Sequence, residues 1–343
     1  MSHGERAASA ALPQHDAHAA VAAWRALDPH GREPSAVETI KEGSPHGRSV
    51  HRLLRAGPEG APVIAKRYRC DVHNGERVFY QEILPLLPVS TPRCYGEIAA
   101  DDGFVWIFVE DAGDERLAPE DAAHRKLATR WLGAMHAAAP ALLFAGRLPD
   151  RGPRHYRTHL ETGRRLILDN LGNPVLRGGD LTLLHEVVAL CETLDRRWGE
   201  VEAICAAAPA TLVHGDFRPK NVFVQSAGQG GERRVLTIDW ETAGWGPPAA
   251  DLAPARRRDG PHVDLEAYCA IVRERWPGFD MPLARRLTWT GLIFRRLAAI
   301  EWAGVSLAFP VAENLAGPLA QLRVYHLELT RALGIEPEEF ARV

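Results

Sequence analysis

The sequence has few cysteines, no long apolar run and almost no net charge. Its five cysteines are widely spaced and never form a C-x-x-C pair, which argues against a disulfide framework or a zinc site and favours reduced thiols. The apolar run at residues 104–109 is far too short to cross a bilayer. Basic residues number 41 and acidic residues 44, so the chain lacks the positive excess with which proteins bind nucleic acid. We therefore expect no nucleic-acid or membrane partner.

We also expect no secretion signal, because residues 1–12 contain no basic segment followed by a continuous apolar one. Together with the unpaired cysteines, this predicts a cytoplasmic protein. The chain has 343 residues, of which 46% are hydrophobic and 25% charged, and these values are ordinary for a globular protein. The length is sufficient for two lobes.

The pattern of apolar residues changes about one third of the way along the chain. Residues 35–109 contain short alternating runs broken by Gly and Pro, which is typical of antiparallel strands, with one helical pattern at 76–87. We expect an α+β fold in three parts: residues 1–34 as a tail and short helix, 35–112 as a lobe of antiparallel sheet plus helix, and 113–343 as a larger, mainly helical lobe. Other helical patterns lie at residues 17–27, 119–138, 181–207, 265–275, 283–304 and 315–333.

A strand-like island at residues 211–239 interrupts the helical half. It contains Asp216, then Asn221, and, after a Gly-rich turn, Asp239. Two short strands joined by a turn form a hairpin, which would bring Asn221 beside Asp239. Carboxylate and amide oxygens suit Mg²⁺, which prefers hard ligands and binds through one or two protein groups plus substrate phosphates. The island therefore predicts a magnesium site.

The motifs of this island resemble those of a known family. The run H-G-D at 214–216, followed by Asn221, and the run I-D-W-E at 238–241 resemble the catalytic loop and metal-binding segment of the aminoglycoside phosphotransferase and choline kinase group, which are small-molecule relatives of the protein kinases. Residues 246–253 resemble the family's usual continuation, and the resemblance covers about residues 40–253. It implies a bilobal protein-kinase-like fold and Mg²⁺-dependent transfer of the γ-phosphate of ATP or GTP to a hydroxyl of a small molecule.

Phosphoryl transfer needs mainly positioning and charge neutralisation. The resemblance implies that Asp216 accepts or orients the proton of the substrate hydroxyl and that Asn221 and Asp239 bind the Mg²⁺ ions. It also implies that His214 and Asp251 brace the loop. Taken alone, Asp216 would be an ordinary turn-capping carboxylate. Arg218, two residues further on, is predicted to contact the transferring phosphoryl group, and a salt bridge to a neighbouring acidic residue is the alternative.

Lys66 ends the run P-V-I-A-K, which resembles the kinase strand whose lysine binds the α and β phosphates. Without the later motif, a lysine on an edge strand is usually a solubility device. Its glutamate partner is Glu76 or Glu82. We choose Glu76, because it falls on the same helical face as the apolar residues of its segment, and keep Glu82 as the fallback.

Backbone groups are expected to make the remaining nucleotide contacts. The loop that contains Gly43, Ser44 and Gly47 would cover the phosphates with its N–H groups, although an ordinary hairpin turn explains it equally well. The segment Glu110-Asp111-Ala112 would be the hinge whose backbone groups meet the nucleobase edge. Because backbone atoms make these contacts, the side chains do not distinguish ATP from GTP.

The acceptor is expected between the catalytic loop and the C-terminal helices, where acidic groups such as Glu301, Asp259 or Asp264 would hold a cationic substrate. Trp302 would stack on a ring or an ammonium group, or else belong to the core. We read His136 as a packing residue with an exposed ring. Aminoglycosides and other antibiotics, which would make this a resistance enzyme, remain open as acceptors, as do choline-like alcohols, sugars and amino-acid alcohols.

Two other functions are weaker interpretations. A kinase-like regulatory protein that binds nucleotide without transfer would be expected to lose at least one of Lys66, Asp216, Asn221 and Asp239, and all four are present. A protein kinase normally has a longer activation segment that ends in A-P-E, which residues 239–251 lack. The compact segment favours a small acceptor.

Overall fold

The computed structural model describes residues 12–42, 48–69, 74–100, 103–142, 145–226, 232–254 and 261–334. Four positions named above, Gly43, Ser44, Gly47 and Asp259, lie outside them. The chain divides into two compact units, a sheet unit of Met1–Glu115 with Phe223–Glu241 and a helical unit of Arg116–Val222 with Thr242–Val343. The expected α+β fold, with an antiparallel sheet followed by a mainly helical region, is confirmed. The three-part division stays a prediction.

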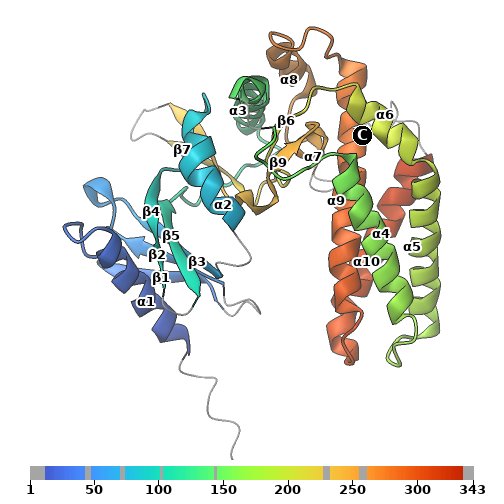
Figure 1. Ribbon diagram of the computed structural model, residues 1–343, viewed down its shortest axis with the longest axis horizontal. Helices are drawn as coiled ribbons and strands as arrows, with labels where there is room; N and C mark the ends of the chain where they lie inside the picture. Colours follow the sequence, from blue (N-terminus) through green and yellow to red (C-terminus); the bar gives the residue numbers. More distant parts are fainter. Residues whose placement is uncertain are drawn as a thin grey trace, which may run out of the picture. The chain divides into compact units, whose positions relative to one another are not determined.

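The sheet unit is built on five antiparallel strands in the order β1-β2-β3-β5-β4 (Figure 1). The strands are β1 (Ala36–Lys41), β2 (Ser49–Leu54), β3 (Val63–Arg69), β4 (Cys94–Ala99) and β5 (Phe104–Glu110). Alternate side chains of β2 are buried, as expected for a strand with one covered face. Helix α1 (Leu12–Leu27) packs Trp24 against Leu53 and Phe108 and so supplies that cover.

The expected helix at 76–87 is not regular. It is made of α2 (Asn74–Val78), a π-helical turn (Phe79–Ile83) and a 3₁₀ turn (Leu84–Leu86). Pro85 has no N–H to donate and its ring clashes with the carbonyl four residues earlier, which explains why the α-helical pattern cannot continue. The apolar face is nevertheless buried as expected, and Phe79 stacks on Trp240 with ring centroids 5.7 Å apart.

A second, two-stranded sheet carries the island's hairpin, in which β7 (Val222–Ser226) pairs with β8 (Arg233–Thr237). A small apolar cluster of Ala112, Phe223 and Leu236 joins this hairpin to the end of β5. The segment that contains Asp239 therefore belongs to the sheet unit, although it comes late in the sequence.

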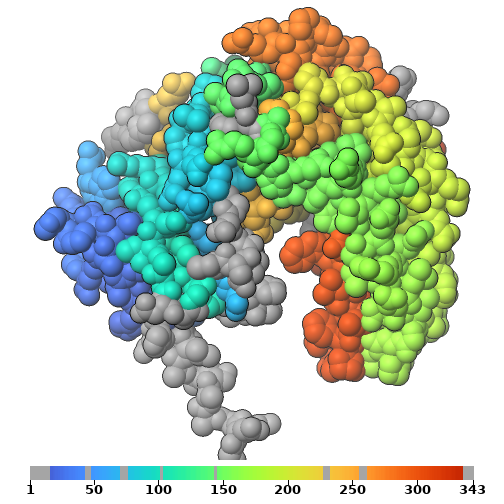
Figure 2. Space-filling view, in the orientation of Figure 1, coloured from blue at the N-terminus to red at the C-terminus, as the bar shows by residue number. Residues whose placement is uncertain are grey.

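The helical unit contains eight α-helices and a short sheet of two strands within its described residues. They are α3 (Ala122–Ala138), α4 (Pro153–Asn170), α5 (Gly178–Arg196), α6 (Trp198–Ala206), α7 (Ala249–Leu252), α8 (Leu265–Val272), α9 (Met281–Ser306) and α10 (Ala312–Gly334), with β6 (Thr211–Val213) and β9 (Gly244–Gly246). Helices α4, α5, α9 and α10 pack side by side (Figure 1). Figure 2 shows α4, coloured green, at the surface of this unit.

Two helix boundaries differ from the sequence pattern for local reasons. Helix α3 begins three residues later than expected, because the Asp121 side chain accepts from the amides of Ala123 and His124 and caps it there. Helix α4 was not anticipated, because it combines many charged residues with few large apolar ones. No helix among the described residues is long and apolar enough to span a membrane.

Helix α9 approaches the segment after β9 very closely. A Cβ at Gly291 would lie 1.9 Å from the carbonyl oxygen of Ala249 in α7, so only glycine permits this contact. The packing fixes α9 against the part of the chain that follows the motif I-D-W-E.

Candidate active site

The predicted catalytic loop follows β6 in the helical unit and begins at His214. Gly215 has φ +78°, and a Cβ there would lie 2.4 Å from the carbonyl oxygen of Thr242, so the turn requires glycine. The amides of His214 and Gly215 both donate to the Asp251 carboxylate, at 2.7 and 2.8 Å. The amide of Asp216 donates to Nδ1 of His214 at 3.3 Å. The structure thus confirms that Asp251 and His214 brace the loop.

His136 also holds Asp251, and the expectation of an exposed ring is wrong. Its side chain is fully buried, with Nε2 3.2 Å from Oδ2 of Asp251 and Nδ1 2.8 Å from the hydroxyl of Tyr268. Burial alone would raise the pKa of Asp251, but the contacts with His136 and His214 lower it overall. The loop therefore rests on a buried, ionised carboxylate.

Asp216 is surrounded by side chains from its own loop. Nδ2 of Asn221 donates to its Oδ2 at 2.9 Å, and Nζ of Lys220 lies 2.9 Å from the same oxygen. Nη2 of Arg218 donates to Oδ2 at 2.7 Å. Burial opposes the charge on Asp216, but Arg218, Arg295 and Lys220 outweigh it and lower the pKa to about 2. Arg218 thus forms the salt bridge weighed above, while its contact with a phosphoryl group stays a prediction.

Arg295, on α9, was missed by the sequence analysis. It is buried and donates Nε to the carbonyl of Ala250 at 3.0 Å and Nη2 to the carbonyl of Phe217 at 3.1 Å. Burial lowers its pKa to about 10. Nothing in the local pattern distinguishes Arg295 from its neighbour Arg296, because only the fold brings α9 to the catalytic loop.

In the sheet unit, the ammonium of Lys66 meets the carboxylate of Glu76. Nζ lies 2.8 and 2.6 Å from the two carboxylate oxygens, and Glu76 is 1% exposed. Glu82, the fallback, is exposed. Nζ also lies 3.6 Å from Oδ1 of Asp239. Burial opposes the charge on Lys66, but Glu76 and Asp239 outweigh it and raise its pKa, so the side chain is a cation.

Asp239 has an unusual backbone conformation. Its φ is +69°, a region that side chains other than glycine rarely adopt, and such residues cluster at functional sites. Two residues later, Glu241 accepts from Nη1 of Arg48 at 2.8 Å. This ion pair, which the sequence did not reveal, joins the residue before β2 to the segment predicted to bind metal.

The predicted hinge is held by its side chains and by some of its backbone groups, among them the carbonyl of Asp111, which accepts from Nε2 of Gln225 at 3.3 Å. Glu110 pairs with Arg234, and Asp111 lies 2.7 Å from Nε of Arg52. Ala112 is buried, and its backbone makes no hydrogen bond within the described residues. The side chains of Glu110 and Asp111 are therefore occupied, which agrees with a hinge that uses backbone groups.

The oxygens predicted to bind Mg²⁺ are chemically suitable. Asn221 uses its Nδ2 to donate to Asp216, which leaves its amide oxygen available to a cation. The side chain of Asp239 is 32% exposed, so its carboxylate is accessible. Oxygen donors of this kind are those that Mg²⁺ prefers. Asn221 belongs to the helical unit and Asp239 to the sheet unit.

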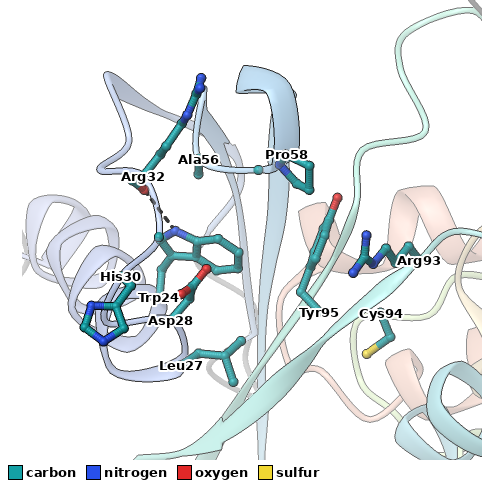
Figure 3. A pocket seen from close by; sticks show the side chains of 12 residues that line it. Trp24, Leu27, Asp28, His30, Arg32, Ala56, Pro58, Arg93, Cys94 and Tyr95 are labelled. Carbon is teal, nitrogen blue, oxygen red and sulfur yellow. Dashed lines mark hydrogen bonds between the residues drawn. The ribbon is translucent and has the colours of Figure 1, made fainter.

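A cavity of about 420 Å³ lies elsewhere in the sheet unit. Figure 3 shows Trp24, Arg32 and Tyr95 among the side chains that line it, with Nε1 of Trp24 donating to the carbonyl of Arg32 at 3.2 Å. None of the described residues predicted to bind nucleotide lines this cavity. We therefore assign it no part in the candidate site.

The acceptor residues expected from the sequence are differently placed. Oε2 of Glu301 lies 2.5 Å from Nδ1 of His159, so this carboxylate already has a partner. Asp264 caps α8 by accepting from the amide of Ala267. Trp302 is 75% exposed, which excludes the core interpretation.

Comparison with known proteins adds a family and a fold. Residues 42–287, more than half of the chain, match the model of a family described as the phosphotransferase enzyme family. A search of curated proteins found no match.

Several solved structures are similar. Choline kinase from Cryptosporidium parvum Iowa II has a TM-score of 0.57 and 13% identity, over 89% of this chain and 92% of that one. The GDP complex of a wild-type aminoglycoside 2'-phosphotransferase has a TM-score of 0.61 and 14% identity, over 91% and 99%. Spectinomycin phosphotransferase, in complex with ADP and spectinomycin, has a TM-score of 0.60 and 12% identity, over 95% and 98%. These likenesses confirm a protein-kinase-like fold.

Proposed function

The chain belongs to the phosphotransferase enzyme family, and on this premise we propose that it transfers the γ-phosphoryl group of ATP or GTP to a hydroxyl of a small molecule. The arrangement of Asp216 carries the proposal. It is an ionised carboxylate on a glycine-dependent turn, braced from below by a buried aspartate and bonded by an asparagine five residues later. Structural roles alone do not require so many groups to hold one partly exposed carboxylate.

In the proposed reaction, the carboxylate of Asp216 accepts a hydrogen bond from the acceptor hydroxyl and orients its oxygen toward the γ-phosphorus. A bond forms between that oxygen and phosphorus, the bond from phosphorus to the β-phosphate oxygen breaks, and the hydroxyl proton passes to Asp216. The nucleoside diphosphate leaves with the electrons of the broken bond. A pKa of about 2 makes Asp216 a weak base. Its main contribution is therefore orientation, with proton transfer late in the reaction.

The sheet unit supplies the nucleotide contacts in this proposal. Lys66, held by Glu76 at 2.6 Å, would bind the α and β phosphates, and the backbone near Ala112 would bind the base. Asn221 and Asp239 would hold Mg²⁺. When bound, this ion neutralises charge on the phosphates and orients them. Arg218 would give up one of its contacts with Asp216 and donate that N–H group to the transferring phosphoryl group.

The acceptor in this proposal is a small molecule. The solved structures with this fold include enzymes named for spectinomycin, aminoglycosides and choline, which are small hydroxyl-bearing compounds. Resistance to an antibiotic is one role that such an activity would serve.

A screen for nucleotide consumption across hydroxyl-bearing compounds, with Mg²⁺ present, tests the proposal. We expect formation of ADP or GDP that depends on one class of compound, and its loss in Asp216→Asn with nucleotide affinity unchanged. Tight nucleotide binding without turnover in every class would instead support a regulatory protein and contradict the proposal.

A further inference from the structure

Three hydrogen-bond donors of the helical unit have no acceptor among the described residues. Arg151 donates Nε to the carbonyl of Thr242 at 2.7 Å and directs Nη1 toward His155, but its Nη2 has no partner. The hydroxyl of Tyr156 makes no hydrogen bond, although the side chain is only 5% exposed. Nη1 of Arg295 is buried without a partner. Buried donors are normally satisfied, so Nη1 of Arg295 needs an explanation, whereas Nη2 of the half-buried Arg151 and the hydroxyl of Tyr156 are open to solvent or to a ligand.

Two of these side chains, Arg151 and Arg295, are connected to the catalytic loop. Thr242, which accepts from Arg151, donates its own hydroxyl to the carbonyl of His214 at 3.0 Å. Arg295 donates to the carbonyl of Phe217, the residue after Asp216. The guanidinium of Arg295 thus bonds the loop directly, and that of Arg151 is connected to it through Thr242.

Tyr156 lies among these charges. Its ring stacks on Phe294, the residue before Arg295 on α9, with centroids 3.8 Å apart and planes 7° from parallel. Burial raises the pKa of Tyr156, and the charges of Arg151, Arg295 and Asp216 all act on it. The hydroxyl is thus a neutral donor within electrostatic range of Asp216, on helix α4, which packs beside α9 (Figure 1).

The positive charge of Arg151 has no bonded carboxylate. Its partners are two backbone carbonyls and an imidazole. The nearby carboxylate of Asp150 accepts from the amide of Gly152 at 2.7 Å and does not bond the guanidinium. Burial, Arg151 and His159 lower the pKa of His155 to about 4, so this imidazole is neutral and provides no counter-charge.

A series of side-chain contacts leads from Arg151 along α4 to Glu301 on α9. Nε2 of His155 lies 3.3 Å from Nη1 of Arg151 and 3.2 Å from Nε2 of His159. Because the guanidinium can only donate, the neutral His155 accepts at this atom, and His159 therefore donates there. His159 also faces Glu301 at 2.5 Å. The carboxylate of Glu301 therefore contacts His159 and makes no bond with Arg151.

We propose that Arg151 and Tyr156 form a subsite for an anionic group of the acceptor, a carboxylate or a phosphate, with the charge of Arg295 supporting it. The inference rests on the proposed function and adds the substrate class, a hydroxyl-bearing acid. Donors without acceptors match a ligand rich in acceptor oxygens. A polycation would bring more donors and like charge to a loop that already holds Arg218, Lys220 and Arg295. The subsite therefore favours an anionic acceptor over the cationic one expected from the sequence.

The test compares acceptors that share a skeleton and differ in charge. Transfer from γ-labelled ATP would be measured as kcat/KM for sugar acids and hydroxy acids, phosphorylated sugars, the matching neutral sugars and alcohols, and a cationic set of amino sugars, choline and aminoglycosides. We expect the best acceptor in one of the two anionic sets, and which set it is distinguishes carboxylate from phosphate. A best acceptor in the neutral or cationic set would overturn the subsite alone. Transfer to no compound would overturn the proposed function together with it.

Two variants test the residues themselves. Tyr156→Phe removes only a hydroxyl that has no partner in the free protein, so thermal stability should be unchanged while KM for the anionic acceptor rises about tenfold. Arg151→Gln should lower kcat/KM for that acceptor about 30-fold or more but change that for its neutral counterpart less than about threefold, because a charged partner is lost. KM for ATP should be unchanged in both.

Arg157→Gln is the matched control, because Arg157 lies on the same helix and pairs with Asp195 at 3.0 Å instead. It should behave as the wild type. If Arg151→Gln impairs charged and neutral acceptors equally, or if Tyr156→Phe leaves acceptor KM unchanged, these residues have a structural role only and the inference is wrong.

Discussion

Replacing Glu76 by glutamine removes the charge that holds Lys66 and changes little else. Both carboxylate oxygens of Glu76 lie within 2.8 Å of the ammonium, and the glutamate is 1% exposed. Glutamine has the same shape and keeps one acceptor oxygen. After the substitution, the nearest carboxylate to Lys66 is that of Asp239, now 3.6 Å from Nζ. We therefore expect Lys66 to move toward Asp239 and away from its phosphate-binding position.

The size of the effect follows from the burial of the pair. Removing one member of a buried ion pair costs about 3–5 kcal/mol, because the remaining charge loses its partner. Lys66 is 20% exposed and keeps Asp239, so we expect the lower end, about 3 kcal/mol. At 1.4 kcal/mol per tenfold, this corresponds to a loss of about 100-fold in kcat/KM for ATP.

The assay is steady-state transfer at varied ATP, with Glu82→Gln as the control. Glu82 lies on the same segment and receives the same substitution, but its side chain is exposed. We expect Glu82→Gln to lie within about twofold of the wild type, because an exposed charge contributes little. Wild-type kcat/KM in Glu76→Gln, or an equal loss in the two variants, would refute the assignment of Glu76.

Four further predictions concern other parts of the site. Gly215→Ala should abolish transfer while circular dichroism shows a folded chain, since its Cβ would lie 2.4 Å from a carbonyl oxygen; retained activity would contradict the turn requirement. Asp216→Asn should lower kcat about 1,000-fold with nucleotide affinity preserved in a titration, and a loss below about tenfold would exclude its proposed role. Asp239→Asn should raise the Mg²⁺ concentration needed for half-maximal transfer at least about tenfold, and an unchanged Mg²⁺ dependence would remove it from the metal site. Burial lowers the pKa of His262 from 6.5 to about 4, so between these pH values the unfolded chain binds a proton that the folded chain does not. The denaturation midpoint should therefore fall as the pH is lowered from 7 to 5, and it should fall less in His262→Gln; an equal pH dependence in the variant would refute this.

Much of the fold was accessible from local pattern. Alternating runs predicted β2 and β3, which each bury one face, and the apolar run at 104–109 predicted β5. The helical stripes predicted α3, α9 and α10 within a few residues. Helix α4 was missed although Tyr156, Leu160, Gly163 and Ile167 recur at helical spacing, because most other residues of the segment are charged or polar and lower its mean hydropathy. The tight contact at Gly163, where a Cβ would lie 3.2 Å from the backbone of Glu301, is visible only in three dimensions.

The candidate site, like the fold, was only partly predictable from the sequence. Motif spacing identified Lys66, Asp216, Asn221 and Asp239, and helical periodicity chose the glutamate that the structure places against Lys66. The roles of these residues stay predictions. The residues that hold or surround them come from distant segments, and Arg295, 79 positions after Asp216, has no local signature. Tertiary contacts such as these depend on helix packing, which periodicity does not specify.

The destination of the γ-phosphoryl group shows whether the protein is a phosphotransferase. Wild-type protein and Asp216→Asn would each be incubated with γ-labelled ATP, Mg²⁺ and the library of matched acceptors, and the labelled products would be separated and identified by mass spectrometry. We expect the wild type to move the label onto an oxygen of one acceptor class and the variant to leave it on ATP. Label that stays on ATP in both samples, or that appears only as inorganic phosphate, would contradict this expectation.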